Sequence, residues 1–583
     1  MKRIPILALA VCSALGWSQS RAPMAFAPRN TITFVERPGV MEFTGKMIAR
    51  PLQVSAWARM GVSPATAEFQ HASAEASIGD LIVGHIKETD CYIIKVPTGD
   101  TENTLAKSLM ATGLFEYVEP DYRVFPAFVP NDPQLTNQWS HSDNQSVNAW
   151  DICRGNSAVT IAVTDTGVHV THEDLIAPRL PGANSASAVD ITDVKTEVVD
   201  GVSWIKDLNG HGTHTSGIAA ASGNNGLGVC GVNISGTKEF MVRVSDSGGG
   251  GASLSALQLG ALWSAQHGAR IVSTSYTGVQ NSSIGTTGTT LKNNYNTLWF
   301  YAAGNDGGNY GSAFDWPDVV IVGSIDQNDQ RSGFSAYGVF TDVFAPGGNI
   351  LSTYWTSDAI NNIYAFQSGT SMATPFAAGL GALVLSENPS YSAQRIEDIV
   401  TRSSITMNDS AFYGWGRVNL WNAMGRVPNS IQTSLGLVTS GGLSDLYRVD
   451  GSSLVIQKAF VPSVGSPKVQ FVTEHNVPAY TGNNYGEIDI LATVSVNTTM
   501  TSFTQQYQLF NFTTGQFETV GSGPVNGTVF EVDKTVNASN YANYIQGGKV
   551  RVRTQLFQTG FVAASSYQAN YDQVVVRTLR ATP

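Results

Sequence analysis

The sequence predicts an α/β fold in three layers, with a mostly parallel sheet between helices, in the middle of a longer chain. Three observations predict it. Short apolar, β-rich runs such as residues 159–163 alternate with helical segments, which is the pattern of a parallel sheet covered on both faces. The 583 residues are too many for one ordinary domain. Beyond about residue 430 the helical periodicity disappears and a different kind of sequence begins.

The first residues have the pattern of a secretory signal peptide. Lys2 and Arg3 precede an apolar run over residues 4–12, as the basic and hydrophobic parts of such peptides do. We place the signal peptide at residues 1–27 and expect the protein to be secreted.

A small α+β segment is expected at residues 28–128. Residues 92–97 form a β-rich run, residues 101–112 have a helical pattern, and residues 115–122 form a second β-rich run. Strands and a helix in so short a stretch predict one small mixed domain ahead of the parallel sheet.

The α/β domain is expected to span residues 129–428. One of its buried strands, at residues 159–163, leads to Asp165. Open α/β sheets carry their chemistry at the carboxyl ends of their strands, so an acid at this point is a candidate functional residue.

A serine and a histidine elsewhere in the domain could form a catalytic site together with this acid. Ser371 stands among small residues ahead of an apolar run, where we expect a helix to start and Pro375 to fall in its first turn. His211 opens another helix after a tight glycine approach. Serine is a weak nucleophile at neutral pH and needs a base, and the base needs a third group that fixes its tautomer. We assign these three roles to Ser371, His211 and Asp165.

Asn305 is the candidate for stabilising an oxyanion. It follows the strand-like residues 298–301, and its amide could donate to a developing negative charge together with the backbone N–H of Ser371. One such donor is typically worth roughly 3–4 kcal/mol in the transition state.

Four sequence blocks resemble those of the subtilisin-like serine proteases, and the resemblance covers about residues 130–425. The blocks are DTGVHVTHEDL from Asp165, NGHGTHTSG from Asn209, AAGNDG from Ala302 and GTSMATPFAAG from Gly369. Their order and spacing agree as well, since Asp165 and His211 are 46 positions apart and His211 and Ser371 are 160 positions apart. The resemblance implies that Asp165 orients, His211 acts as general base and acid, Ser371 is the nucleophile and Asn305 is the oxyanion donor.

The resemblance also implies what surrounds the reaction. Polypeptides are the expected substrates, and no cofactor is expected for catalysis. Residues 28–128 resemble the family's inhibitor-type propeptides, which assist folding and block the cleft. Self-cleavage is therefore expected near residues 120–130.

Members of this family bind the substrate backbone as an added strand between two edges of the cleft. The resemblance implies that one edge contains Gly248, Gly249 and Gly250, and the other Ser275, Tyr276, Thr277 and Gly278. The family commonly has two glycines after Ser-Leu at the second edge, and this chain departs from that pattern at Tyr276 and Thr277. We expect broad specificity with a preference for apolar or aromatic side chains.

Residues 222–229 resemble the family's tight calcium loop, which implies a structural calcium ion. Asp174, nine positions after Asp165, matches the carboxylate partner of that loop. Calcium takes about six to eight oxygen ligands, carbonyls included. The expected ligands are the side chains of Asp174 and Asn225, with the carbonyls of Gly223, Leu227 and Val229. A polar loop without a metal is the open alternative.

Residues 429–583 are expected to fold as an antiparallel β-sandwich. Short β-rich runs alternate there with glycine, asparagine and serine turns. They include residues 469–472, 507–510, 550–553 and 574–576. The sequence does not identify a partner for this domain.

Composition argues against some classes of function. Only 14% of the residues are charged and the net charge is −11, which argues against nucleic-acid binding and fits a soluble secreted protein. No run of about 20 apolar residues after the signal peptide predicts a membrane span. Four cysteines do not make a disulfide scaffold. Export allows Cys153 and Cys230 to pair, and the small apolar neighbours of Cys230 fit a buried thiol equally well.

Other readings of the motifs are weaker. A zinc protease needs His-Glu-x-x-His, and His172-Glu173 lacks the second histidine. An α/β-hydrolase needs its histidine after the serine, and the one that follows Ser371 is His475, in a different kind of sequence. The serious alternative is a catalytically silent, protease-like scaffold for adhesion or binding. Such scaffolds usually lose a catalytic residue, and none is missing here.

Overall fold

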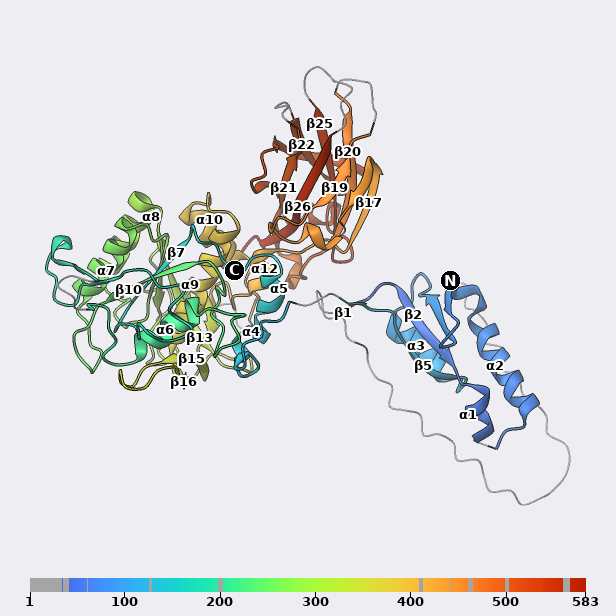
Figure 1. Cartoon of the computed structure of the whole chain (residues 1–583), viewed down its shortest axis with the longest axis horizontal. Helices are drawn as coiled ribbons and strands as arrows, with labels where there is room; N and C mark the ends of the chain where they lie inside the picture. The colour runs from blue at the N-terminus through green and yellow to red at the C-terminus, as the bar shows by residue number, and fades with distance from the viewer. Residues whose placement is uncertain are drawn as a thin grey trace. The chain divides into compact units, whose positions relative to one another are not determined.

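The computed structural model describes residues 34, 41–59, 61–124, 128–197, 203–407, 413–441, 443–459, 465–498, 503–558 and 567–583. The expected signal peptide at residues 1–27 lies outside them. The chain divides into two compact units, Met1–Pro126 and Ala127–Pro583 (Figure 1).

The first unit is a small α+β domain, as the sequence predicts. Its antiparallel sheet has the strand order β3-β4-β2-β5, with β2 at Lys46–Pro51, β3 at Ile82–Ile86, β4 at Cys91–Lys95 and β5 at Phe115–Pro120. The helices are α1 (Val54–Arg59), α2 (Pro64–Ile78) and α3 (Glu102–Met110), and β1 (Met41–Glu42) pairs with β6 (Arg123–Val124). Thr101 caps α3 through a capping box with Thr104. Residues from the sheet, α2 and α3 share one hydrophobic core.

An eight-stranded sheet forms the centre of the second unit. Its order is β14-β13-β12-β11-β7-β10-β8-β9, and its pairs are parallel except for β8 with β9. The strands are β7 (Thr160–Asp165), β8 (Ala183–Asn184), β9 (Lys195–Thr196), β10 (Lys238–Arg243), β11 (Ile271–Thr274), β12 (Leu298–Ala302), β13 (Val319–Ile325) and β14 (Val343–Pro346).

Helices cover both faces of this sheet and give the three layers that the sequence predicts. Alternate residues of one strand serve opposite faces: Phe300 of β12 belongs to a core with α6, α9 and α10, while Trp299 and Tyr301 belong to a core with α7 and α8. The helices are α4 (Trp139–Asp143), α5 (Ser146–Trp150), α6 (His211–Ala220), α7 (Leu254–Gln266), α8 (Ser282–Tyr295), α9 (Thr370–Glu387), α10 (Ala393–Arg402) and α12 (Leu420–Met424). A hairpin of β15 (Ile350–Tyr354) and β16 (Ile363–Gln367) packs against α6.

The described residues from 430 onward form the predicted β-sandwich. Its two antiparallel sheets have the orders β17-β20-β25-β22-β23 and β18-β19-β26-β21-β24. The strands are β17 (Ser430–Leu435), β18 (Leu437–Ser440), β19 (Leu454–Gln457), β20 (Pro467–Asn476), β21 (Tyr485–Val496), β22 (Phe503–Asn511), β23 (Gln516–Pro524), β24 (Phe530–Thr535), β25 (Lys549–Gln558) and β26 (Gln568–Arg580). Apolar side chains from the inner faces of both sheets form one core.

The sandwich and the α/β domain also share a hydrophobic core. Leu491, Val575 and Leu579 of the sandwich are fully buried in the cluster that contains α9 and α10. Arg426, just after α12, pairs with Val576 of β26 through two backbone hydrogen bonds. The sandwich is therefore continuous with the helical layer that carries Ser371.

Candidate active site

Asp165 ends β7 and is fully buried. Its Oδ1 accepts the backbone N–H of Thr166 at 2.7 Å, and its Oδ2 accepts the hydroxyl of Thr215 at 3.2 Å. A buried carboxylate needs such donors because burial alone disfavours its charge. These bonds hold the carboxylate in one orientation.

His211 is the first residue of α6 and faces Asp165. The preceding Gly210 has φ +101°, and a Cβ there would lie 2.4 Å from the carbonyl oxygen of Trp355, so this approach requires glycine. The Nδ1 of His211 lies 2.7 Å from Asp165 Oδ1. Burial lowers the pKa of His211, but the charge and hydrogen bond of Asp165, with the charge of Asp207, outweigh it and raise the pKa above its usual value. When His211 is neutral, Nδ1–H donates to Asp165 and Nε2 is left as the acceptor.

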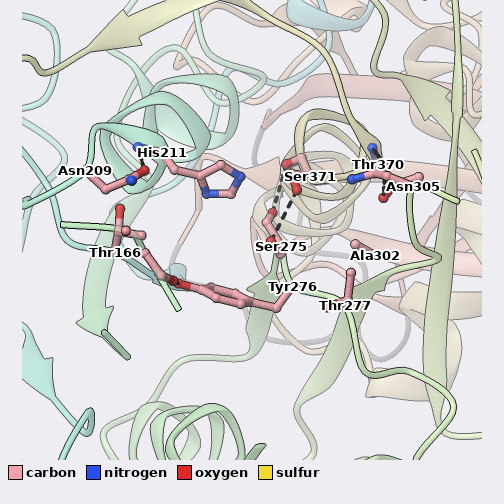
Figure 2. Close-up of a pocket in the computed structure, with 12 residues that line it drawn as sticks. Thr166, Asn209, His211, Ser275, Tyr276, Thr277, Ala302, Asn305, Thr370 and Ser371 are labelled. Atoms are coloured by element: carbon pink, nitrogen blue, oxygen red, sulfur yellow. Dashed lines mark hydrogen bonds between the residues drawn. The ribbon is translucent and has the colours of Figure 1, made fainter. Parts of the chain in front are cut away.

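Ser371 lies at the N-terminal end of α9 and lines the same cleft as His211. Figure 2 shows the imidazole pointing toward Ser371. The Ser371 hydroxyl donates to the carbonyl of Ser275 at 3.2 Å. Catalytic hydrogen bonds often align only when substrate binds.

The structure confirms a helix start beside Ser371 and corrects the expected position of Pro375. The helix begins at Thr370, so Pro375 lies inside it and not in the first turn. A proline has no N–H to give to the carbonyl four residues before it. That carbonyl, of Ser371, accepts the hydroxyl of Ser275 at 2.8 Å instead. The proline thus leaves an acceptor that ties the serine to the loop after β11.

Asn305 is held so that its amide N–H groups are available to the cleft. Its Oδ1 accepts both the backbone N–H and the hydroxyl of Thr370, at 2.8 and 2.9 Å. Because these two donors fix the oxygen, the Nδ2 end is the one left to donate. Asn305 lines the cleft beside Ser371 (Figure 2).

The cleft has a volume of about 230 Å³. It is lined by Thr166, Asn209, His211, Gly249, Gly250, Ser275, Tyr276, Thr277, Ala302, Asn305, Thr370 and Ser371. Five of the seven residues expected to bind substrate are in this set, while Gly248 and Gly278 are not. The carbonyl of Gly248 instead accepts the side-chain amide of Asn209 at 2.8 Å, and Gly278 occupies a turn with φ +115°.

Tyr276 connects the two expected edges. Its hydroxyl donates to the carbonyl of Gly250 at 2.8 Å, and its ring meets the imidazole of His211 edge-on with centroids 6.4 Å apart. Tyr276 and Thr277, where this chain departs from the family pattern, both line the cleft.

Sequence reasoning gave no role to several cleft residues. Thr166, Asn209 and Ala302 lie inside the quoted blocks but carried no separate signal. Asp207 was missed as well: it is fully buried and hydrogen-bonds to Thr166 and to the start of α6. Aspartate side chains readily accept backbone N–H groups a few residues further along the chain, and the place of Asp207 just before the helical histidine is a local signal that could have found it.

Asp174 and Asn225, the expected metal ligands, do lie together. The Asn225 amide donates to Asp174 Oδ1 at 2.9 Å, while Asp174 Oδ2 accepts the Val229 N–H and the Tyr364 hydroxyl, each at 3.0 Å. Burial raises the pKa of Asp174. A second buried carboxylate, that of Asp132, accepts backbone N–H groups of the same loop.

The oxygen atoms in and beside this loop are of the kind that bind calcium. The partners of the Asp174 carboxylate are neutral, so its charge fits a hard divalent cation. Across the residues that the structure covers, no group of three or more His, Cys, Asp or Glu side chains is arranged to hold a metal ion. Calcium therefore stays a prediction.

Two further expectations concern cysteines and membranes. Cys153 and Cys230 are free thiols, and Cys230 is buried with its Sγ donating to Asp132 at 3.3 Å. In the described part of the chain, each helix is too short or too polar to cross a bilayer.

Comparison with known proteins agrees with this geometry. Residues 156–416 match the model of the subtilase family. Thermitase of Thermoactinomyces vulgaris is 37% identical over 307 residues, which is 51% of this chain and 99% of thermitase. A thermophilic serine proteinase of Bacillus sp. (strain AK1) is 36% identical over 346 residues, 57% of this chain and 77% of that protein.

A third relative extends further along this chain. The halolysin-like extracellular serine protease Nep of Natrialba magadii is 33% identical over 363 residues, 60% of this chain and 64% of Nep. Because relatives named as serine proteases are matched over most of their length, this chain is a member of the subtilase family of serine proteases.

Proposed function

We propose that this chain is a secreted serine endopeptidase that hydrolyses peptide bonds through an acyl-enzyme on Ser371. One observation carries the proposal: the 2.7 Å bond between Asp165 and His211 lies at the edge of the cleft that Ser371 and Asn305 also line. Acyl transfer needs an oriented base, a nucleophilic hydroxyl and a donor for the oxyanion, and this cleft places such groups together.

In the first half of the reaction, Ser371 Oγ leaves the Ser275 carbonyl and attacks the carbonyl carbon of the substrate. His211 Nε2 takes the hydroxyl proton, and the imidazolium that forms is stabilised by Asp165. The oxyanion accepts hydrogen bonds from Asn305 Nδ2 and the backbone N–H of Ser371, near the positive end of the α9 dipole.

In the second half, His211 gives its proton to the leaving amine and the acyl group stays on Ser371. A water molecule then gives a proton to His211 and attacks the ester by the same route. The second tetrahedral intermediate collapses, the carboxylic acid product leaves, and Ser371 regains its proton.

The proposal includes a self-processed precursor. Residues 28–128 act as a propeptide that inhibits the enzyme until it is cleaved. A separate compact unit with its own hydrophobic core supports this, as does the basic and apolar pattern at residues 2–12 for export.

We further propose that a calcium ion stabilises the loop around residues 223–229. Asp174, Asn225 and Asp132 would supply side-chain oxygens, and the carbonyls of Gly223, Leu227 and Val229 would supply the rest. The ion has no part in the chemistry, and its effect would be on stability.

The test is to express the wild type and Ser371→Ala from the same secretion host and to measure the intact mass of each product. We expect the wild type to lose its N-terminal unit near residues 120–130 and to digest an unfolded protein. Ser371→Ala should remain a full-length precursor without activity. Normal maturation of Ser371→Ala would show that an outside protease does the processing. A wild type that digests nothing after removal of the unit would contradict the proposed activity.

A further inference from the structure

Asp207 is a buried carboxylate that accepts five hydrogen bonds beside the proposed active site. It lies four residues before His211 and is fully buried. Its Oδ1 accepts the Thr166 hydroxyl and the backbone N–H groups of Asn209 and Gly210, each at 2.9 Å. Its Oδ2 accepts the backbone N–H and hydroxyl of Thr213, at 2.9 and 2.5 Å.

These bonds join three segments that must be in register for the site to form. Thr166 directly follows Asp165, Gly210 directly precedes His211, and Thr213 lies in the first turn of α6. The Thr166 hydroxyl also accepts the backbone N–H of Gly212 at 2.8 Å. Both neighbours of His211 along the chain are therefore bonded into the Asp207 network, and so is the neighbour of Asp165.

Asp207 also interacts electrostatically with the imidazole of His211. The charged or titratable groups around His211 are Asp165 from β7, Asp207, His214 from α6 and the ring of Tyr276. Asp207 acts with Asp165 in favouring the protonated imidazole. Asp207 also interacts electrostatically with His169. Lys206 and Asp358, which form an ion pair with each other, interact with His169 as well.

We propose that Asp207 is a positioning residue for the proposed acyl transfer: its carboxylate holds His211 in register with Asp165 and adds a second negative charge that stabilises the imidazolium. Asp207 does not line the cleft, so it acts through His211 and Thr166. The inference rests on the proposed function. A role in helix capping alone would change stability and leave the ionisation of His211 as it was.

The test compares Asp207→Asn, Thr166→Val and a control, Asp450→Asn, in the mature enzyme. Asp450 also accepts a backbone N–H, from Ser452 at 2.9 Å, but lies in the C-terminal sandwich. The measurements are kcat and KM on a peptide substrate and kcat/KM against pH. The wild type must first react with a fluorophosphonate and cleave the peptide, since failure there would overturn the proposed function itself.

Asp207→Asn should lower kcat by about 10-fold or more, because small displacements of catalytic groups are costly. It should also move the acidic limb of kcat/KM to lower pH, because a charge that favours imidazolium is lost. Thr166→Val removes the link to Gly212 but keeps the charge, so it should lower kcat and leave the limb in place. Asp450→Asn should change neither.

An acidic limb at the wild-type pH in a folded Asp207→Asn enzyme would overturn the inference. If that variant does not fold, Thr166→Val decides: a kcat within twofold of wild type would overturn the positioning role, and a fall in kcat with an unmoved limb would support it.

Discussion

At the residue scale, the direction of each hydrogen bond decides what the site can do. Thr370 donates twice to Asn305 Oδ1, and this leaves the amide N–H groups as the only end that can meet an oxyanion. Asp165 accepts from His211 Nδ1, and this leaves Nε2 as the nitrogen that can accept a proton. In both cases the partner of one end of the side chain determines which end is left to face the reaction.

Asn305→Ala should lower kcat by about 10²–10³ with little change in KM, because the donor acts on charge that exists only in the transition state. Steady-state kinetics on a peptide substrate measure this. Asn309→Ala is the control, since Asn309 bonds Gly311 in the same region and does not line the cleft. A kcat for Asn305→Ala within a few-fold of wild type would remove Asn305 from the oxyanion site.

The pKa of His211 predicts the acid side of the pH profile. The proposed base works only when neutral. Burial lowers the pKa of His211, but the charge and hydrogen bond of Asp165 outweigh it and raise the pKa, so kcat/KM should fall as pH drops through a value above the usual one of about 6.5. Asp165→Asn removes that charge. It should shift the limb to lower pH and reduce kcat by about 10⁴. An unshifted limb in Asp165→Asn would show that another group controls it.

At the element scale, the layers were predictable and the fine geometry was not. The parallel strands are apolar on both faces because helices cover both faces, so the order of strands and helices appears in the sequence. The three proposed catalytic residues, Asp165, His211 and Ser371, lie in sequence blocks that resemble the motifs of the family, so they could be predicted. The contact from Tyr276 to Gly250 depends on the distance between two loops that only tertiary packing sets, and so does the clustering of donors around Asp207.

The position of Pro375 within α9 was likewise not predictable from the local sequence. Pro375 indicates a first turn by propensity, yet α9 begins at Thr370 and contains the proline. The cost of the missing N–H is reduced because Ser275 bonds the freed carbonyl of Ser371. A partner 96 positions away in the sequence cannot be inferred from local rules.

The loop around residues 223–229 carries the calcium prediction. Adding a calcium chelator should lower the Tm of the mature enzyme, because an ion that binds only the folded state stabilises it, by about 2.7 kcal/mol at 100 times its Kd. Added calcium should restore the Tm and magnesium should not. Asp174→Asn should lose the response. A Tm that is the same with and without chelator would show a loop held by its hydrogen bonds alone.

At the scale of the whole molecule, the C-terminal sandwich is built into the α/β domain by charge as well as by apolar packing. Arg395 of α10 lies 2.7 Å from Glu487 and 2.9 Å from Asp489 of β21. In the opposite direction, the fully buried Arg577 of β26 lies 2.5 Å from Glu387 of α9. Each domain thus contributes an arginine that pairs with a carboxylate of the other domain. These ion pairs stabilise the interface only while both partners of each pair are present.

Arg577→Met should destabilise residues 127–583 by about 3–5 kcal/mol, because it leaves Glu387 buried without its partner. Burial already raises the pKa of Glu387, to about 7, against the opposing charge of Arg577. Urea or thermal unfolding measures the loss. Arg448→Met is the control, since its pair with Asp450 is about one-third exposed, and exposed pairs contribute about 0–1 kcal/mol. Equal effects of the two changes would contradict an integrated interface.

The proposed mechanism requires Ser371 to be the nucleophile of a site that His211 and Asp165 complete. Reaction of the mature protein with a fluorophosphonate, followed by peptide mapping of the modified residue, tests this role of Ser371. One label for each chain on Ser371 is predicted, with none on Ser371→Ala and much slower labelling of His211→Ala. No label on the folded wild type after removal of the N-terminal unit, or a label on another residue, would contradict this role.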